Sequence, residues 1–177
     1  MAPLIIVHGP TRAGKSSQAA MLAQHHGYVH FSSGQILRDT KDPEILQRLA
    51  TGALARSEDI LRLMREALDA VPANKSIVID GFPRKMNEFI EFESWLSAMN
   101  RKLTHIIEIY ISPEESHKRG EHRGRGDDEY DAVEQKWSWY RTDVKAVLDY
   151  AKQHHDVHTV DGVGTPAEVA ARIEAVL

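Results

Sequence analysis

The chain has 177 residues, of which 42% are hydrophobic and 27% are charged, a balance that fits one globular domain. Its net charge of -4 argues against a non-specific nucleic-acid binder, which would carry a basic surplus. The absence of cysteine excludes a disulfide framework and a cysteine-based zinc knuckle, so we expect no zinc. No segment reaches membrane-spanning length and no signal peptide is evident, so we expect a cytoplasmic protein without nucleic-acid or membrane partners.

Short apolar runs alternate with helical patterns along the chain. The expected strands cover residues 4–8, 28–31, 76–80, 104–111 and 157–160. The expected helices cover residues 15–26, 33–39, 43–51, 57–70, 87–99, 113–122, 129–154 and 166–177. Ser57 and Thr165 are the expected N-caps of two of them. Because each strand is nearly continuous in apolar residues, the pattern predicts an α/β fold, in which helices cover both faces of a five-stranded parallel sheet in three layers.

The first strand leads into a loop, Gly9 to Ser16, that matches the pattern G-x-x-x-x-G-K-[ST]. A strand, such a loop and a helix N-terminus surround a polyphosphate with backbone N–H groups. Lys15 would add a positive charge at the β- and γ-phosphates, and the Ser16 hydroxyl would ligate Mg²⁺. An accidental glycine turn is the alternative, but the strand before the loop and the helix after it favour a nucleotide site of the P-loop NTPase kind.

A second acidic position follows the apolar strand 76–80. The strand ends at Asp80, where phosphate-loop proteins place a carboxylate that holds Mg²⁺ directly or through water, and we expect water between them. Apolar strands also end in ordinary Asp-Gly turns, so Asp80 alone is a weak signal. Together with the phosphate loop, it favours a magnesium site at Ser16 and Asp80.

Basic residues gather late in the chain, at positions 118, 119, 123, 125, 136 and 141. Arg119 and Arg123 are four residues apart and share a helical face, and the nearby glycines at 124 and 126 free the backbone around Arg125. A solvated surface is one interpretation. The other is a flap that closes over phosphates with bidentate arginines.

These motifs resemble those of the adenylate kinase family of nucleoside monophosphate kinases, in its form with a short lid. The resemblance covers nearly the whole chain and includes the run D-G-F-P-R without change. Its six segments are 9–18, 31–38, 52–54, 80–84, 119–128 followed by Tyr140, and 161–162 followed by 167–169.

The resemblance implies transfer of the γ-phosphoryl group of Mg-ATP to a nucleoside monophosphate, with AMP as the expected acceptor. It implies one domain over 1–177, with an acceptor-binding lobe at about 32–61 and a lid at about 120–132, in a monomer or, as the second choice, a trimer. The implied catalytic residues are Lys15, Arg84, Arg123, Arg125 and Lys136. The implied ATP-binding residues are Gly9, Arg12, Ala13, Gly14, Lys15, Ser16, Ser17, Arg119, Arg123 and Gly164. The implied acceptor-binding residues are Ser33, Arg38, Ala53, Leu54, Ala55, Gly81, Phe82, Arg84, Glu88, Arg125 and Lys136.

Three departures from the family pattern bear on activity. Arg12 occupies the position of a loop glycine, and we expect its side chain to point outward. Gln35 replaces an aspartate near the water shell of the metal. Lys136 stands where the family has an arginine, which keeps the charge but loses the two-pronged fork.

A fourth departure concerns the acceptor base. Glu88 stands where the family has a glutamine that reads adenine, and a carboxylate accepts hydrogen bonds without donating any. Two N–H donors of guanine would suit it, so GMP or another nucleoside monophosphate is the alternative acceptor. Two other interpretations are that Asn87 reads adenine instead, or that Glu88 is a solvated residue at a helix start.

Two other functions stay open. A small-molecule kinase of the shikimate or gluconate kind would share the phosphate loop, but the segments 31–38 and 80–84 argue against it. A nucleotide-binding switch or assembly factor with weak turnover is compatible with Gln35 and Lys136. His154 and His158 have helical ligand spacing, but a strand is expected to begin between them, so we expect no metal there.

Overall fold

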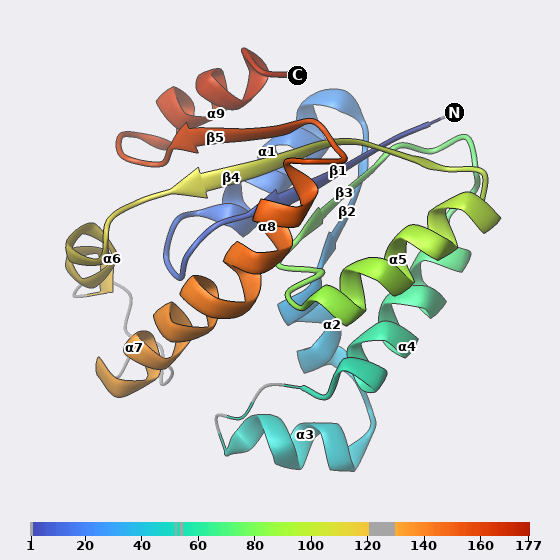
Figure 1. The fold of residues 1–177 in the computed structure, drawn as a ribbon, viewed down its shortest axis with the longest axis horizontal. Coiled ribbons are helices and arrows are strands. Elements are labelled where there is room, and N and C mark those ends of the chain that lie inside the picture. Colours follow the sequence, from blue (N-terminus) through green and yellow to red (C-terminus); the bar gives the residue numbers. More distant parts are fainter. Residues whose placement is uncertain (1, 52, 54, 121–129) are drawn as a thin grey trace.

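The computed structural model describes residues 2–51, 53, 55–120 and 130–177, with only the backbone at residue 130. The predicted parallel sheet of five strands is confirmed, in the order β2-β3-β1-β4-β5 (Figure 1). The strands of the described residues are β1 (Pro3–His8), β2 (Val29–Ser32), β3 (Ile77–Asp80), β4 (Lys102–Tyr110) and β5 (Val157–Asp161).

Helices cover both faces of this sheet, as Figure 1 shows. The helices of the described residues are α1 (Lys15–His26), α2 (Ser33–Asp39), α3 (Pro43–Ala50), α4 (Ser57–Asp69), α5 (Met86–Ala98), α6 (Pro113–Gly120), α7 (Tyr130–Trp139), α8 (Lys145–Ala151) and α9 (Pro166–Glu174). Helices α1 and α9 pack through residues such as Leu22 and Ile173 into one apolar cluster. Helices α4, α5 and α8 contribute Met64, Phe92 and Leu148 to a second cluster. The three-layer α/β/α architecture is therefore present.

The two apolar clusters explain why the strands are apolar along their whole length. Successive side chains of a strand point to opposite faces of the sheet. In β1, Leu4 and Ile6 belong to the cluster with α4 and α5, whereas Ile5 and Val7 belong to the cluster with α1 and α9. All four are buried, so a polar residue at any of them would face a core.

The functional residues gather where the strands end. From β1 the chain first builds β2 and β3 on one side and later β4 and β5 on the other. In such a sheet, ligands bind at the carboxyl ends of the strands, beside the point where the direction reverses. The register aligns Val7 with Asp80 and Ser32 with Asp80, which brings the phosphate loop and the strand-end carboxylate to this edge.

Two details of the helices differ from the sequence prediction. The long helix expected at 129–154 is interrupted, within the described residues, by a π-helical segment, η1, at Tyr140–Val144. Ser57 is the first residue of α4 rather than its N-cap, because Arg56 occupies the cap position and the Ser57 hydroxyl donates to Glu88 instead. The expected start of α9 is confirmed, since the Thr165 hydroxyl accepts from the backbone N–H of Glu168 at 3.3 Å.

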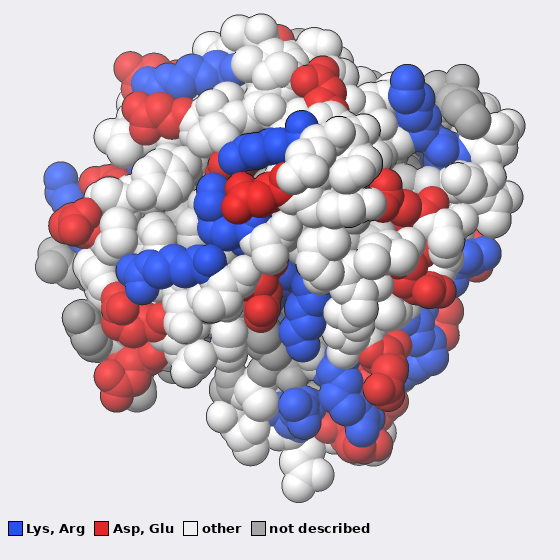
Figure 2. All heavy atoms as spheres, viewed as in Figure 1, with Lys and Arg blue, Asp and Glu red and all other residues white. Residues whose placement is uncertain are grey.

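The surface in Figure 2 intersperses acidic and basic side chains on the face that it shows. Among the described residues, no helix is both long enough and apolar enough to cross a bilayer.

Candidate active site

The phosphate loop joins the end of β1 to the start of α1. Gly9 has φ 144° and Gly14 has φ 89°, backbone conformations that favour glycine. A Cβ at Gly9 would also collide with the carbonyl oxygen of Ile109 on the neighbouring strand. Lys15 Nζ lies 2.6 Å from the carbonyl oxygen of Pro10, so the ammonium group stays over the loop. Ala13 is buried beneath it, whereas Ser16 and Ser17 are exposed at the start of α1.

Arg12 has a left-handed backbone with φ 63°, which costs free energy in a residue with a side chain. Its guanidinium leaves the loop and donates to the Ser116 carbonyl oxygen on α6 at 3.2 Å. Its own carbonyl oxygen accepts from Arg119 Nη1 at 3.2 Å. The side chain is half-buried against α6, and these contacts help to hold the strained loop residue in place.

Asp80 is buried at the end of β3 and faces the phosphate loop. Its Oδ1 accepts from the Ser16 hydroxyl at 2.9 Å and from the Ser32 hydroxyl at 3.4 Å, and its Oδ2 lies 2.8 Å from His30 Nε2. Mg²⁺ prefers hydroxyl, carboxylate and water oxygens. Ser16 and Asp80 bring the first two together, so these residues fit the magnesium ion that the resemblance implies.

A small pocket beside Asp80 is formed by α2, α4 with the segment before it, the segment after β3 and the start of α5. It is lined by Ser33, Leu37, Ala55, Ile60, Gly81, Phe82, Arg84, Lys85 and Glu88. Five of the residues expected to bind the acceptor therefore meet with Arg84 in this pocket. Ala53 is half-buried, and Leu54 lies outside the described residues.

Arg84 is the arginine of this pocket. Arg84 Nε donates to the Gly81 carbonyl oxygen at 2.7 Å, and Nη2 donates to Ser33 Oγ at 3.5 Å. Burial lowers the pKa of Arg84, while the nearby carboxylates of Glu88 and Asp80 raise it. An arginine stays protonated at neutral pH despite such a shift, so the pocket holds a half-buried positive charge suited to an anionic group.

Arg38 lies on the exposed side of α2 and is not among the residues that line the pocket of Arg84. Its Nη2 donates to Gln35 Oε1 at 2.9 Å, and Gln35 Nε2 donates to Asp39 at 2.7 Å. Gln35, which replaces the family aspartate, thus orients Arg38.

Glu88 is 4% exposed, so the interpretation of a solvated residue is wrong. Its Oε1 accepts from the Ser57 hydroxyl at 2.8 Å. Its Oε2 accepts from the backbone N–H groups of Arg84 at 2.9 Å and Lys85 at 3.3 Å. The carboxylate therefore caps α5 and joins it to α4, whereas Asn87 beside it is exposed.

Arg119 connects three parts of the expected ATP site. Its guanidinium donates to Glu115 Oε1 and to the Gly162 carbonyl oxygen, both at 2.8 Å, besides its bond to the loop residue Arg12. The backbone at Gly164, two residues after Gly162, has φ 127°. Arg123 and Arg125 lie outside the described residues.

Lys136 lies half-buried on α7, just before the segment η1. Tyr140, the first residue of η1, donates its hydroxyl to the buried carboxylate of Glu108 on β4. Glu108 also accepts from Thr159 Oγ1 at 2.7 Å and lies 3.6 Å from Lys145 Nζ. Burial and the adjacent Glu108 raise the pKa of Tyr140, so its hydroxyl stays protonated. These contacts fix the segment that follows Lys136 to the sheet.

His8 is a residue of this region that sequence reasoning missed. It ends β1 directly before the loop, is 2% exposed, and its Nε2 has no hydrogen-bond partner among the described residues. Burial lowers its pKa to about 3, with further lowering by Lys15 and Arg84 and an opposing effect of Asp80. The signal that could have found it is a histidine at the end of an otherwise apolar strand.

Comparison with known proteins agrees with this geometry. A family model described as "Adenylate kinase" matches residues 7–156. An adenylate kinase of Mycobacterium sp. (strain MCS) is 33% identical over 174 residues, with 95% of each chain covered. An adenylate kinase of Thermus thermophilus is 33% identical over 183 residues, covering 98% of this chain and 96% of the relative. One of Maricaulis maris is 30% identical over 183 residues, covering 98% and 97%. The match extends over both the loop that starts at Gly9 and the pocket of Arg84, and the chain belongs to the adenylate kinase family.

Proposed function

We propose that this protein transfers the γ-phosphoryl group of Mg-ATP to AMP and releases two ADP. One observation carries the proposal: the contact of Ser16 in the phosphate loop with Asp80 at the end of β3 lies beside the pocket that contains the half-buried Arg84. The proposed triphosphate site and the proposed second anion site would thus adjoin at one edge of the sheet. The family membership and the relatives named adenylate kinase support the same activity.

The residues suggest how the donor is held. The backbone N–H groups of the loop and the N-terminus of α1 would surround the phosphates, and Lys15 would stabilise the charge on the transferring group. Ser16, and Asp80 through water, would hold Mg²⁺, which supplies charge neutralisation of the phosphate oxygens. Arg119, held by its bond to the Gly162 carbonyl oxygen, would stack on the donor base.

Transfer to the acceptor phosphate needs positive charge and alignment rather than a general base. A phosphate oxygen of AMP is already anionic, so its attack on the γ-phosphorus releases no proton. Arg84 and Arg38 would hold this phosphate in line with the donor, which lowers the barrier by orientation and electrostatics. Arg123, Arg125 and Lys136 would complete the positive cover over the transferring group. The acceptor lobe at about 32–61 and the lid at about 120–132 are part of this proposal.

AMP is preferred over GMP in this proposal because of Glu88. To take two N–H donors of guanine, the carboxylate would need free lone pairs on both oxygens facing the base. Its oxygens already accept from Ser57, Arg84 N–H and Lys85 N–H. Breaking these hydrogen bonds would remove the N-terminal cap of α5. We therefore expect the carboxylate to keep its position when a nucleotide base enters the pocket.

The test is an acceptor panel. The purified protein is assayed with Mg-ATP and each of AMP, GMP, CMP, UMP and dTMP, and ADP formation is followed by a coupled assay. We expect AMP to give the highest kcat/KM. A higher kcat/KM for GMP than for AMP would contradict the assignment of adenine as the acceptor base. A lack of ADP formation with all of them, despite tight binding of diadenosine pentaphosphate, would favour the nucleotide-binding switch.

Compartment and assembly are part of the proposal as well. We propose a cytoplasmic monomer, with a trimer as the second choice. Light scattering coupled to size-exclusion chromatography separates a 19.9 kDa monomer from an assembly with three times this mass.

A further inference from the structure

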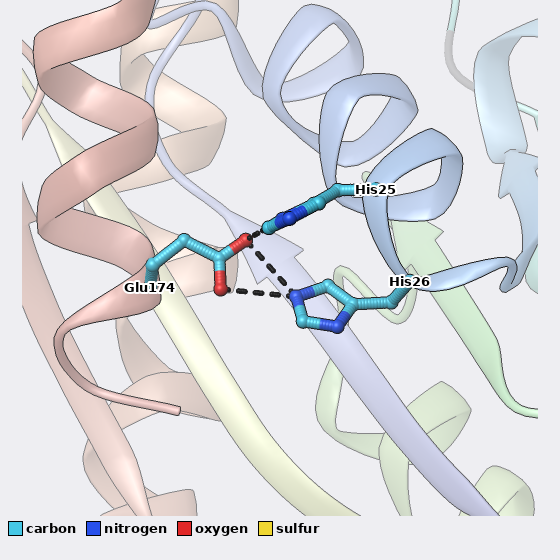
Figure 3. A group of neighbouring side chains, drawn as sticks. All are labelled: His25, His26 and Glu174. Atoms are coloured by element: carbon cyan, nitrogen blue, oxygen red, sulfur yellow. Dashed lines mark hydrogen bonds and ion pairs between the residues drawn. The ribbon is translucent and has the colours of Figure 1, made fainter.

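Three ligand-type side chains converge on the surface on the α1–α9 side of the sheet (Figure 3). His25 and His26 are the last residues of α1, and Glu174 is the last residue of α9. His25 Nδ1 lies 2.9 Å from Glu174 Oε1, and His26 Nε2 lies 3.0 Å from each carboxylate oxygen. Two helices that are far apart in sequence therefore aim three ligand groups at one point, as Figure 3 shows.

The convergence of two neighbouring histidines is unusual for a helix. Consecutive residues of an α-helix project about 100° apart, so their rings normally diverge. Here His25 presents Nδ1, the nitrogen close to its backbone, whereas His26 presents the more distant Nε2. This difference in reach lets both rings meet the same carboxylate. His26 Nε2 is equally far from both carboxylate oxygens. A single N–H can form a well-aligned hydrogen bond with only one of them.

Hydrogen bonding by itself explains little of this arrangement. The side chain of His25 is 71% exposed, and those of His26 and Glu174 are 32% and 34% exposed. Contacts between exposed charged groups add little stability and cost side-chain entropy. Among the described residues, three or more histidine, cysteine or carboxylate ligand atoms lie within 4.8 Å of one another at His25, His26 and Glu174.

The donor set indicates the kind of ion. Two imidazole nitrogens and one carboxylate oxygen suit Zn²⁺ and its first-row neighbours, whereas Mg²⁺ and Ca²⁺ prefer oxygen alone. Tetrahedral bonds of about 2.0–2.2 Å separate ligand atoms by about 3.3–3.5 Å. The present separations between the carboxylate oxygens and the ring nitrogens need to open by only a few tenths of an ångström, which exposed side chains allow.

We propose that His25, His26 and Glu174 form a binding site for a divalent transition metal ion of the Zn²⁺ class, which joins the end of α1 to the end of α9. Water from the solvent side would complete the coordination. The proposal departs from the expectation of no zinc, which rested on the lack of cysteine. It does not depend on the kinase activity, because the site lies at the opposite end of α1 from Lys15.

The packing around the site predicts what the ion would do. At the other end of the same helix pair, Gln18 Nε2 donates to the carbonyl oxygen of Pro166 at 2.9 Å, so α1 and α9 are already joined there. An ion at His25, His26 and Glu174 would join them at the second end as well. We therefore expect it to raise the melting temperature without entering the phosphate site.

The test uses the full chain after removal of any affinity tag and treatment with a chelator, without nucleotide. ZnCl₂ or CoCl₂ is titrated against it by calorimetry, and Co²⁺ absorption in the visible range reports the coordination geometry. The variants His26→Ala and Glu174→Gln remove one ligand each. His154→Ala is the matched control, because His154 is an exposed histidine near the end of α8 that bonds the Tyr150 carbonyl oxygen. Asp80→Asn identifies any binding at the magnesium site.

We expect one Zn²⁺ per chain and a rise in melting temperature of about 5–10 °C at a free metal concentration about 100 times Kd. Each ligand variant should weaken binding about tenfold or more, since even outer partners of metal ligands contribute that much. His154→Ala and Asp80→Asn should bind as the parent does. Binding that persists in both ligand variants, or no rise in melting temperature in the parent, would overturn the proposal.

Discussion

Tyr140 and Glu108 form a buried hydrogen bond between the start of the π-helical segment and β4. A π-helical turn forms when local backbone bonds are exchanged for a better tertiary fit, and such turns often lie at functional sites. Here the turn brings the Tyr140 hydroxyl to the carboxylate of Glu108, four residues after Lys136. The position of Lys136 thus depends on a contact with the sheet.

Tyr140→Phe should destabilise the fold by about 1–3 kcal/mol, because it leaves a buried carboxylate oxygen with one donor fewer. Chemical denaturation measures this loss. Tyr110→Phe on the same strand as Glu108 is the control, since Tyr110 is 43% exposed. Equal effects of the two substitutions would show that the hydrogen bond is not what holds the segment.

His8 should make stability depend on pH. Its pKa is 6.5 ordinarily and about 3 in the folded chain. Above pH 6.5 His8 is neutral in both states. As the pH falls from 6.5 towards 3, His8 becomes protonated in the unfolded chain but stays neutral in the folded chain. The free energy of unfolding therefore decreases by up to about 1.4 kcal/mol per pH unit. His8→Leu should flatten this slope in denaturation curves, whereas His154→Ala should retain it.

Arg84→Lys should lower kcat/KM for AMP about 10- to 100-fold, since hydrogen bonds to charged groups contribute about 1.5–3 kcal/mol. Lysine keeps the charge but loses the fork that reaches Gly81 and Ser33. Steady-state kinetics at varied AMP and saturating Mg-ATP measure the effect, and an unchanged melting temperature rules out unfolding. An unaltered kcat/KM would remove Arg84 from the acceptor site. Lys75→Arg, at an exposed position before β3, is the control for a lysine–arginine exchange elsewhere.

Glu88→Gln tests whether residue 88 caps α5 or reads the base. The amide loses the charge that accepts the two backbone N–H groups, so stability should fall by about 1 kcal/mol. The preference for AMP over GMP should remain. Ser57→Ala, which removes the other partner of Glu88, should likewise leave the preference unchanged. If the preferred acceptor is GMP in the parent and becomes AMP in Glu88→Gln, the carboxylate contacts guanine.

The sequence determined most of what depends on local pattern. Segment 33–39 was predicted as a helix and is one, and the Thr165 cap of α9 was correct, because both follow from residues a few positions apart. The phosphate loop and its relation to Asp80 followed from the apolar strands that precede them. Gly81 and Arg84 of the motif D-G-F-P-R line one pocket, and their binding of the acceptor stays a prediction.

What escaped the sequence depends on partners far along the chain. The π-helical turn begins at Tyr140, which contacts Glu108, 32 residues earlier, and no periodicity encodes that contact. Ser57 was expected to cap α4, but its hydroxyl instead donates to Glu88, 31 residues later, and joins α4 to α5. His26 and Glu174 are 148 residues apart, so their convergence is visible only in the fold.

The single carboxylate of Asp80 contacts α1 through Ser16 and β2 through His30 and Ser32. An engineer who wished to change the enzyme's preference among divalent ions would find Asp80 a poor place to begin. Any replacement there would loosen the junction of α1 with β2 and β3 at the same time as it altered the proposed magnesium ligand. Ser16, the other proposed ligand, is exposed and donates to Asp80, so substitutions there would test ion selectivity while they leave the contacts of Asp80 with β2 intact.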